Sequence, residues 1–169
     1  MLRPILRYGD AFLHRPAEPL GDITPEIQTL IDDMIQTMYA APGIGLAAPQ
    51  VGVPLRLFVV DLSLGHQSRD LIVLVNPRFV EREGMQLEEE GCLSLPGFNA
   101  TVARPQRVLV AGRGRDGREH VVEGTGLLAR ALQHEMDHLD GRLFVDRVRG
   151  VKRQAIVRKV RKLARAGRW

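Results

Sequence analysis

The sequence predicts an α+β fold in which antiparallel β-sheets pack around a central helix, with an amphipathic helix at the C-terminal end. Apolar residues recur at helical spacing in three segments. One lies near the start of the chain, one ends at residue 141 and one lies near the end of the chain. Short apolar runs rich in β-branched residues fill the middle of the chain. Within 108–122, Asp116-Gly117 lies between apolar segments, which is typical of a tight antiparallel hairpin.

The first helix is expected over about residues 25–39. Thr24 suits the N-cap and Pro25 suits the first helical position, whereas Pro42 and Gly43 would end the helix. Its apolar face is predicted to contain Ile27, Leu30, Ile31, Met34 and Met38.

Strands are expected in the middle of the chain. Segments 55–62 and 71–75 are apolar, and the second is too apolar for a solvent-exposed face. Asn76-Pro77 is predicted to break this second strand, after which 79–83 forms another short strand.

Two further helices are expected. Thr125 can cap the central helix, which ends at Gly141. The predicted buried face of this helix consists of Leu127, Leu128, Ala131 and Leu132. The last helix, over about 151–166, is amphipathic, and its apolar stripe consists of Val151, Ile156, Val160 and Leu163.

The composition predicts one globular domain over 1–169, in which 147–169 is a basic C-terminal helix. Hydrophobic residues make up 44% and charged residues 26% of the chain. No apolar run approaches the roughly 20 residues of a membrane span, and the N-terminus lacks a signal-peptide pattern. The single cysteine excludes an internal disulfide. We therefore expect a monomeric cytoplasmic protein without a membrane segment.

The net charge of +4 is distributed unevenly along the chain. Residues 147–169 include ten Lys or Arg residues and no acidic residue, whereas the rest of the chain holds 14 basic and 20 acidic residues. A basic end on an acidic body predicts a polyanionic partner at that end.

The motif QHEMDHLDG, at residues 133–141, carries the clearest chemical signal. His134 and His138 are four residues apart, so on a helix both imidazoles lie on one face and converge. Glu135 beside them could deprotonate a water bound to a metal ion held there. Because this five-residue pattern also occurs by chance, with solvated or core histidines, the hypothesis needs a third ligand.

No good third ligand follows the helix. Phe144 stands where one class of metalloproteases has a third histidine, and no His, Asp or Glu occurs beyond Asp146. An upstream ligand is therefore required, and Cys92, the only cysteine, is the candidate. The alternative for a lone cysteine is a small buried apolar residue.

The glycine-rich segment GIGLAAPQVG, at 43–52, is a second candidate site. It formally matches a dinucleotide-binding fingerprint, but a helix precedes it and Pro49 prevents a regular helix after it. Glycines also let a backbone approach a ligand closely. Gln50 is then either a ligand contact or a solvated turn residue.

Taken together, GIGLAAPQVG, EGCLSLPG and QHEMDHLDG resemble the three signature motifs of peptide deformylase in order and spacing. The opening PILRYGD and the basic C-terminal helix also look like those of bacterial members. The resemblance implies removal of the formyl group from the N-formyl-methionine of nascent polypeptides, with release of formate.

The resemblance also implies a role for each motif residue. The ligands of one divalent metal ion would be Cys92, His134 and His138. This ion is expected to be Fe²⁺, with Zn²⁺ or Ni²⁺ as alternatives. Glu135 would be the general base, and then the acid, as metal-bound hydroxide attacks the formyl carbon. The backbone N–H of Leu93 and the side-chain amide of Gln50 would form the oxyanion hole. The residues that would contact the formyl group, the methionine and the peptide are Ile44, Gly45, Gly91 and Leu127.

Two further expectations follow from the resemblance. In the family the C-terminal helix docks on ribosomal RNA near the exit tunnel, and the acid-free segment 147–169 suits such docking. Arg130 stands where members often have an apolar residue lining the methionine pocket. We expect its stem to line the pocket and its charged head to reach water.

Three alternatives remain at this level. A metalloprotease that cleaves internal bonds needs a third ligand after the helix. A metal-stabilised RNA-binding module needs a fourth protein ligand, and none is evident. A deformylase-like paralogue with an altered substrate shares every motif.

Overall fold

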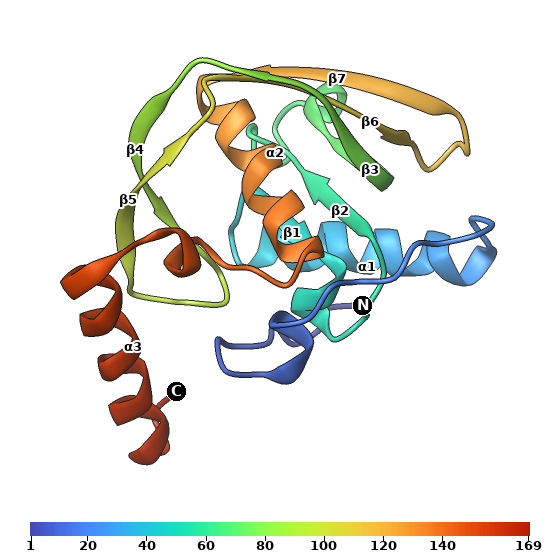
Figure 1. Cartoon of the computed structure of the whole chain (residues 1–169). Coiled ribbons are helices and arrows are strands. Elements are labelled where there is room, and N and C mark those ends of the chain that lie inside the picture. The colour runs from blue at the N-terminus through green and yellow to red at the C-terminus, as the bar shows by residue number, and fades with distance from the viewer.

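The computed structural model describes residues 1–169 and has the predicted α+β architecture, in which helix α2 crosses the middle of the molecule (Figure 1). The helices are α1 (Pro25–Ala40), α2 (Gly126–Leu139) and α3 (Gly150–Arg165), with short 3₁₀ segments η1 (Ala11–Leu13), η2 (Ala48–Val51), η3 (Ser68–Asp70) and η4 (Phe144–Arg147). The strands are β1 (Gly45–Ala47), β2 (Leu57–Val60), β3 (Ile72–Glu83), β4 (Gln86–Gly91), β5 (Asn99–Arg104), β6 (Arg107–Arg113) and β7 (Glu119–Thr125).

The strands form two separate antiparallel sheets. One has five strands in the order β1-β2-β3-β6-β7, and the other consists of β4 and β5. The hairpin predicted around Asp116-Gly117 is confirmed, because β6 pairs with β7 and Gly117 has a φ of 79° in the connection. Strands β4 and β5 were not predicted, since β4 is too acidic to show an apolar alternation.

Helices α1 and α2 cover opposite faces of the five-stranded sheet at β2. Phe58 and Val60 pack in one core cluster with α2, whereas Leu57 and Val59 pack in another with α1. This alternation follows from the two-residue period of a strand, and it explains why β2 is apolar at every position. The residues of α2 in the first cluster are Ala129, Ala131, Leu132, Met136 and Leu139.

A third core cluster joins the small sheet to the C-terminal part of the chain. Val102 of β5 and Phe144 of η4 pack there with Ile156 and Val160 of α3. Helix α3 otherwise extends away from the body of the molecule (Figure 1). The predicted apolar stripe is therefore wrong at one end, because Val151 is 82% exposed.

The predicted strand break at Asn76-Pro77 is also wrong. Strand β3 runs through it, with a register shift between Val75 and Arg78. Asn76 adopts a φ of 50°, and its side-chain amide both accepts from and donates to the backbone of Leu20, at 2.8 Å in each case. Asparagine tolerates this conformation, so the irregularity is absorbed as a bulge rather than a turn.

The predicted helix starts are confirmed for α1 and only partly for α2. The Thr24 hydroxyl accepts a hydrogen bond from the backbone N–H of Ile27, as an N-cap should. Thr125 occupies the N-cap position of α2 with extended backbone but makes no side-chain capping bond. Leu127 is not on the buried face, because it is 57% exposed. No helix of the structure has the length and apolar character needed to cross a membrane.

Candidate metal centre

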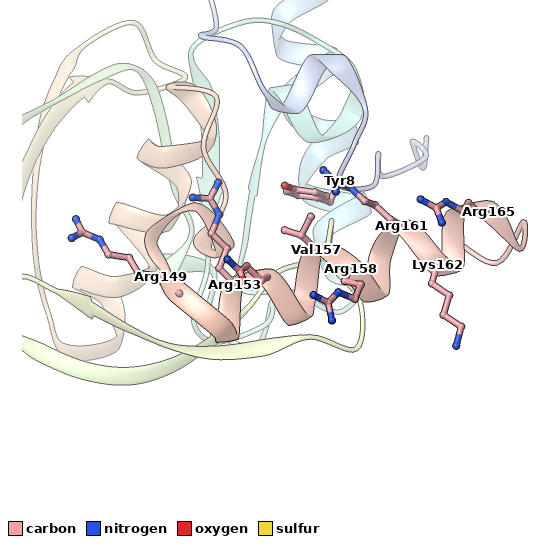
Figure 2. Close-up of a pocket in the computed structure, with 10 residues that line it drawn as sticks. Tyr8, Arg149, Arg153, Val157, Arg158, Arg161, Lys162 and Arg165 are labelled. Carbon is pink, nitrogen blue, oxygen red and sulfur yellow. The ribbon is translucent and has the colours of Figure 1, made fainter.

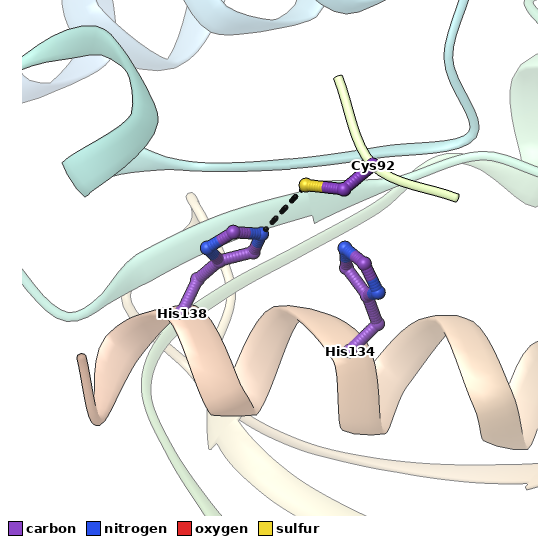
Figure 3. A group of neighbouring side chains, drawn as sticks. All are labelled: Cys92, His134 and His138. Atoms are coloured by element: carbon purple, nitrogen blue, oxygen red, sulfur yellow. Dashed lines mark hydrogen bonds between the residues drawn. The ribbon is translucent and has the colours of Figure 1, made fainter. Parts of the chain in front are cut away.

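The structure brings the sole cysteine and the two motif histidines together. Cys92 directly follows β4, and His134 and His138 lie one turn apart on α2 with their rings facing the sulfur (Figure 3). One potential ligand atom from each residue lies within 4.8 Å of the others. Sγ of Cys92 is 3.3 Å from Nε2 of His138.

The chemistry of this cluster fits a divalent transition metal ion. A thiolate and two imidazoles are ligands that suit zinc and iron(II), and three protein ligands leave room for a water or substrate. Two buried polar atoms beside the cluster, Oε2 of Glu135 and Nδ1 of His138, have no hydrogen-bond partner in the protein. Unsatisfied buried polar atoms are rare, and Oε2 of Glu135 is one that lies beside the three candidate ligands.

The titration behaviour of the two imidazoles also indicates a site for positive charge. Although burial opposes protonation, the neighbouring Cys92 and Glu90 raise the pKa of His134 well above its usual range. Burial and then the charge on His134 lower the pKa of His138. The cluster thus favours one positive charge on the two imidazoles, and a bound metal ion would take the place of the proton that otherwise supplies it.

Glu135 lies next to the cluster in a dry environment. Glu135 is 3% exposed, and burial raises the pKa of its carboxyl to about 7. The backbone of Gly45 packs directly against it, because a Cβ built on Gly45 would lie 2.6 Å from Oε1 of Glu135. A carboxyl with a pKa near neutrality is suited to accept and then return a proton.

A pocket of about 380 Å³ opens onto this cluster. It is lined by nine of the ten site residues that the resemblance implies, namely Ile44, Gly45, Gln50, Gly91, Cys92, Leu93, Leu127, His134 and Glu135, and also by Arg130. His138 lies beneath them, with no exposed surface. The exposure of Leu127 is therefore compatible with a position at the wall of this pocket.

Gln50 is a buried residue of η2 rather than a solvated turn glutamine. It is 1% exposed, and its Oε1 accepts a hydrogen bond from the backbone N–H of Ala47 at 2.9 Å. Its Nε2 donates to Oγ of Ser94 at 3.1 Å and lies 3.7 Å from Sγ of Cys92. These contacts fix the amide with its N–H groups toward the cysteine. The backbone N–H of Leu93 donates to no acceptor within the protein.

A network of buried charges behind His134 was missed in the sequence. Glu90 accepts a hydrogen bond from Nδ1 of His134 at 2.8 Å and pairs with Arg104. Although burial opposes its charge, Arg104 and His134 lower the pKa of Glu90 to about 2. Asp137 in turn bridges Arg104 and Arg147, at 3.0 and 2.7 Å. The only signal in the sequence was the acidic run that ends at Glu90, and nothing there shows which acid is buried.

The expectation for Arg130 is confirmed for the pocket, which the residue lines, but is wrong for its charged head. The residue is 4% exposed, and its guanidinium turns inward rather than to water. Its Nη2 donates to the backbone carbonyl of Val102 at 2.9 Å, and Nη1 donates to Glu90. Hydrogen bonds from a charged guanidinium to such acceptors are strong, and they compensate for its removal from water.

Comparison with known proteins identifies the family. A model described as "Polypeptide deformylase" matches residues 2–154. A peptide deformylase of Acidobacterium capsulatum is 49% identical over 169 residues, which cover 100% of this chain and 99% of that protein. One from Thermodesulfovibrio yellowstonii is 54% identical over 155 residues, or 92% of this chain and 94% of that protein.

Solved structures agree. The crystal structure of a peptide deformylase from Legionella pneumophila superimposes with a TM-score of 0.92 at 45% identity, covering 99% of this chain and 98% of that one. A peptide deformylase from Synechococcus elongatus, in complex with actinonin, gives a TM-score of 0.88 at 42% identity over 95% of this chain and 90% of that one. The protein therefore belongs to the polypeptide deformylase family, whose members are metal-dependent enzymes that remove N-formyl groups from polypeptides.

Proposed function

We propose that this enzyme removes the formyl group from the N-formyl-methionine of nascent polypeptides in the cytoplasm and releases formate. The observation that carries the proposal is the placement of Glu135 beside Cys92, His134 and His138 at the base of one open pocket. This arrangement supplies a metal-binding group and a proton acceptor at the same point, as hydrolysis of an amide requires.

Cys92, His134 and His138 would hold the metal ion. Iron(II) is proposed on the resemblance to the family, with zinc or nickel as alternatives that the same ligands accept. When bound, the ion would lower the pKa of a water molecule and polarise the formyl oxygen.

Glu135 would take the proton from the attacking water and return it to the amine that leaves. Its pKa of about 7 suits both steps near neutral pH. Gln50 and the N–H of Leu93 would donate hydrogen bonds to the formyl oxygen as negative charge builds there. Because the Gln50 amide is already fixed by Ala47 and Ser94, it needs no reorientation during the reaction.

The walls of the pocket would bind the substrate. Ile44 and Leu127 supply apolar surface for the methionine side chain. Gly45 and Gly91 present backbone without side chains, so an extended peptide could approach closely. At Gly91 even a Cβ would lie 2.5 Å from Oδ1 of Asn99.

We also propose that α3 binds ribosomal RNA near the exit tunnel while the enzyme acts as a monomer. Arginine and lysine side chains line a groove of about 1140 Å³ along α3, beside Tyr8 (Figure 2). Such a surface attracts a phosphate backbone. Replacing both Arg158 and Lys162 by Glu should weaken co-sedimentation with ribosomes and reduce its dependence on salt, whereas formate release from a free peptide should not change.

The activity is tested by assaying three peptides as substrates. The protein is purified without oxygen and loaded with iron(II). N-formyl-Met-Ala-Ser should release formate, whereas N-acetyl-Met-Ala-Ser should remain intact. A longer peptide with a free amino terminus should not be cut internally. Internal cleavage would support a protease instead, and failure of the folded, metal-loaded protein to release formate would refute the proposed substrate.

A further inference from the structure

We propose that Arg130 is a positioning residue of the metal centre: it holds the Glu90 carboxylate in place, and Glu90 in turn orients His134. The inference deepens the proposed function and rests on it, since it takes His134 as a metal ligand. Arg130 also lines the substrate pocket, where its simplest role would be to form part of the wall.

The guanidinium of Arg130 makes its hydrogen bonds to protein groups, and one of these groups is Glu90. Its Nε donates to Oε1 of Gln86 at 3.1 Å, its Nη2 to the carbonyl of Val102 at 2.9 Å, and its Nη1 to Glu90. With three groups on β4 and β5 as acceptors, the guanidinium has one allowed orientation. It therefore ties α2 to both strands of the small sheet.

Glu90 is the point at which these contacts meet the metal centre. One carboxylate oxygen, Oε1, accepts from Nδ1 of His134 at 2.8 Å and from Arg104 at 2.8 Å. The other oxygen, Oε2, is paired with Arg104 and with Arg130. Because Nδ1 of His134 is committed to Glu90, its Nε2 is the nitrogen left to bind a metal ion.

Arg104 does not make Arg130 redundant. Arg104 lies on β5 and also pairs with Asp137, so its position is shared between two carboxylates. Arg130 lies on the same helix as His134, one turn earlier. A carboxylate held from this helix moves with the histidine that it orients. Without Arg130, Oε2 of Glu90 would keep a single partner, and the carboxylate could rotate away from Nδ1.

The test measures metal binding directly. Protein freed of metal is titrated with cobalt(II), and both the dissociation constant and the thiolate-to-cobalt absorption band are recorded. Arg130→Leu should weaken cobalt binding by about 10–100-fold, the range found for groups that orient metal-bound histidines. The band should also shift, because the geometry around the cobalt changes.

Arg107→Leu is the matched control. Arg107 pairs with Glu81, Glu83 and Glu123 on the large sheet, so the variant also removes an arginine with several carboxylate partners. Its cobalt affinity and spectrum should equal those of wild type. Arg130→Lys keeps a cation near Glu90 but lacks the planar fork that also reaches Val102 and Gln86, so an intermediate affinity is expected.

The outcomes distinguish a failure of the role assigned to Arg130 from a failure of the proposed metal centre. Wild-type cobalt affinity and spectrum in Arg130→Leu, with only a higher KM for the formylated peptide, would show a pocket wall and overturn the inference. If circular dichroism shows that Arg130→Leu does not fold, Arg130→Lys decides, and wild-type affinity there would again overturn it. If wild type shows no thiolate–cobalt band, or Cys92→Ser retains it, the proposed metal centre fails instead.

Discussion

The backbone of Gly45 lies against the carboxylate of Glu135, so that a Cβ at position 45 would lie only 2.6 Å from Oε1. This distance is shorter than any ordinary carbon–oxygen contact, and it couples the glycine-rich segment to the centre of α2. The absence of a side chain at Gly45 is thus a condition for the observed position of the proposed general base.

Gly45→Ala should therefore displace Glu135 and lower kcat. A displacement near 1 Å at a reacting group typically costs about 10²-fold in rate. Bound metal should remain, because the three atoms nearest to a Cβ at position 45 all belong to Glu135, which is not one of the proposed ligands. The control is Gly21→Ala, since a Cβ at Gly21 meets no atom within 4 Å. Wild-type kcat in Gly45→Ala would show that Glu135 tolerates the shift or does not act in the reaction.

Gln50→Met should lower kcat while the protein still binds metal. The change removes the proposed donor to the formyl oxygen, and the loss of one such donor costs roughly 10²–10³-fold. Ser94→Ala is the comparison, because it removes only a hydrogen-bond partner of Gln50 and should cost much less. Steady-state formate release and metal content, measured on the same samples, check this. Equal losses in the two variants would argue against a direct role for Gln50.

The sequence predicted the metal cluster because its three ligands lie in two compact motifs. Two of them are separated by one helical turn, so local geometry alone places them together. Cys92 could be added because no good ligand follows the helix and it is the only cysteine upstream. The pocket residues of the glycine-rich segment were reached through the resemblance and not through periodicity.

The buried charges could not be predicted in the same way. Glu90, Arg104 and Asp137 are far apart in sequence, and each looks like an ordinary solvated residue in its own segment. Only the pairing of β4 with β5, and the packing of α2 against them, shows that they are mutual partners. Arg130 was misjudged for the same reason, since an exposed head is the default for an arginine until its acceptors are known.

Asp137→Ala should destabilise the fold. Asp137 is buried and pairs with Arg104, which is also buried, and with Arg147, which precedes α3. Removing one partner of a buried ion pair leaves an uncompensated charge and typically costs about 3–5 kcal/mol. Urea unfolding at neutral pH measures the loss. Asp116→Ala, at an exposed hairpin turn, should cost far less, and equal losses would show that the buried network adds no stability.

The Tyr39–Asp61 pair should make stability depend on alkaline pH. Burial and the hydrogen bond to Asp61 raise the pKa of Tyr39 from 10.0 to about 12. Between these values the folded protein keeps a proton that the unfolded chain releases, so the stability gained from the raised pKa is present below pH 10 and is lost as pH rises toward 12. The difference in unfolding free energy between wild type and Tyr39→Phe should thus be constant near neutral pH and shrink above pH 10. A difference independent of pH in urea titrations would contradict this.

Asp61 should act at the other end of the pH scale. Although burial opposes its charge, hydrogen bonds from Ser63 and Tyr39 lower its pKa below 3.8. A carboxyl whose pKa is lowered by folding stabilises the fold at pH values above its ordinary pKa. This contribution is lost as the pH falls through the pKa of the folded state. The same wild-type and Tyr39→Phe samples should therefore also converge in acid. Parallel acid curves would show that the tyrosine hydroxyl does not stabilise the Asp61 carboxylate.

The most direct test of the proposed centre is to measure kcat and bound metal in the same anaerobic sample of Glu135→Gln. Removing a general base typically lowers kcat by about 10²–10⁴-fold. Because the proposed ligands are Cys92, His134 and His138, the variant should still bind one metal ion per chain. Loss of turnover with the metal retained is the expected result. Turnover close to that of wild type, with metal present, would contradict the assignment of Glu135 as the residue that moves the proton.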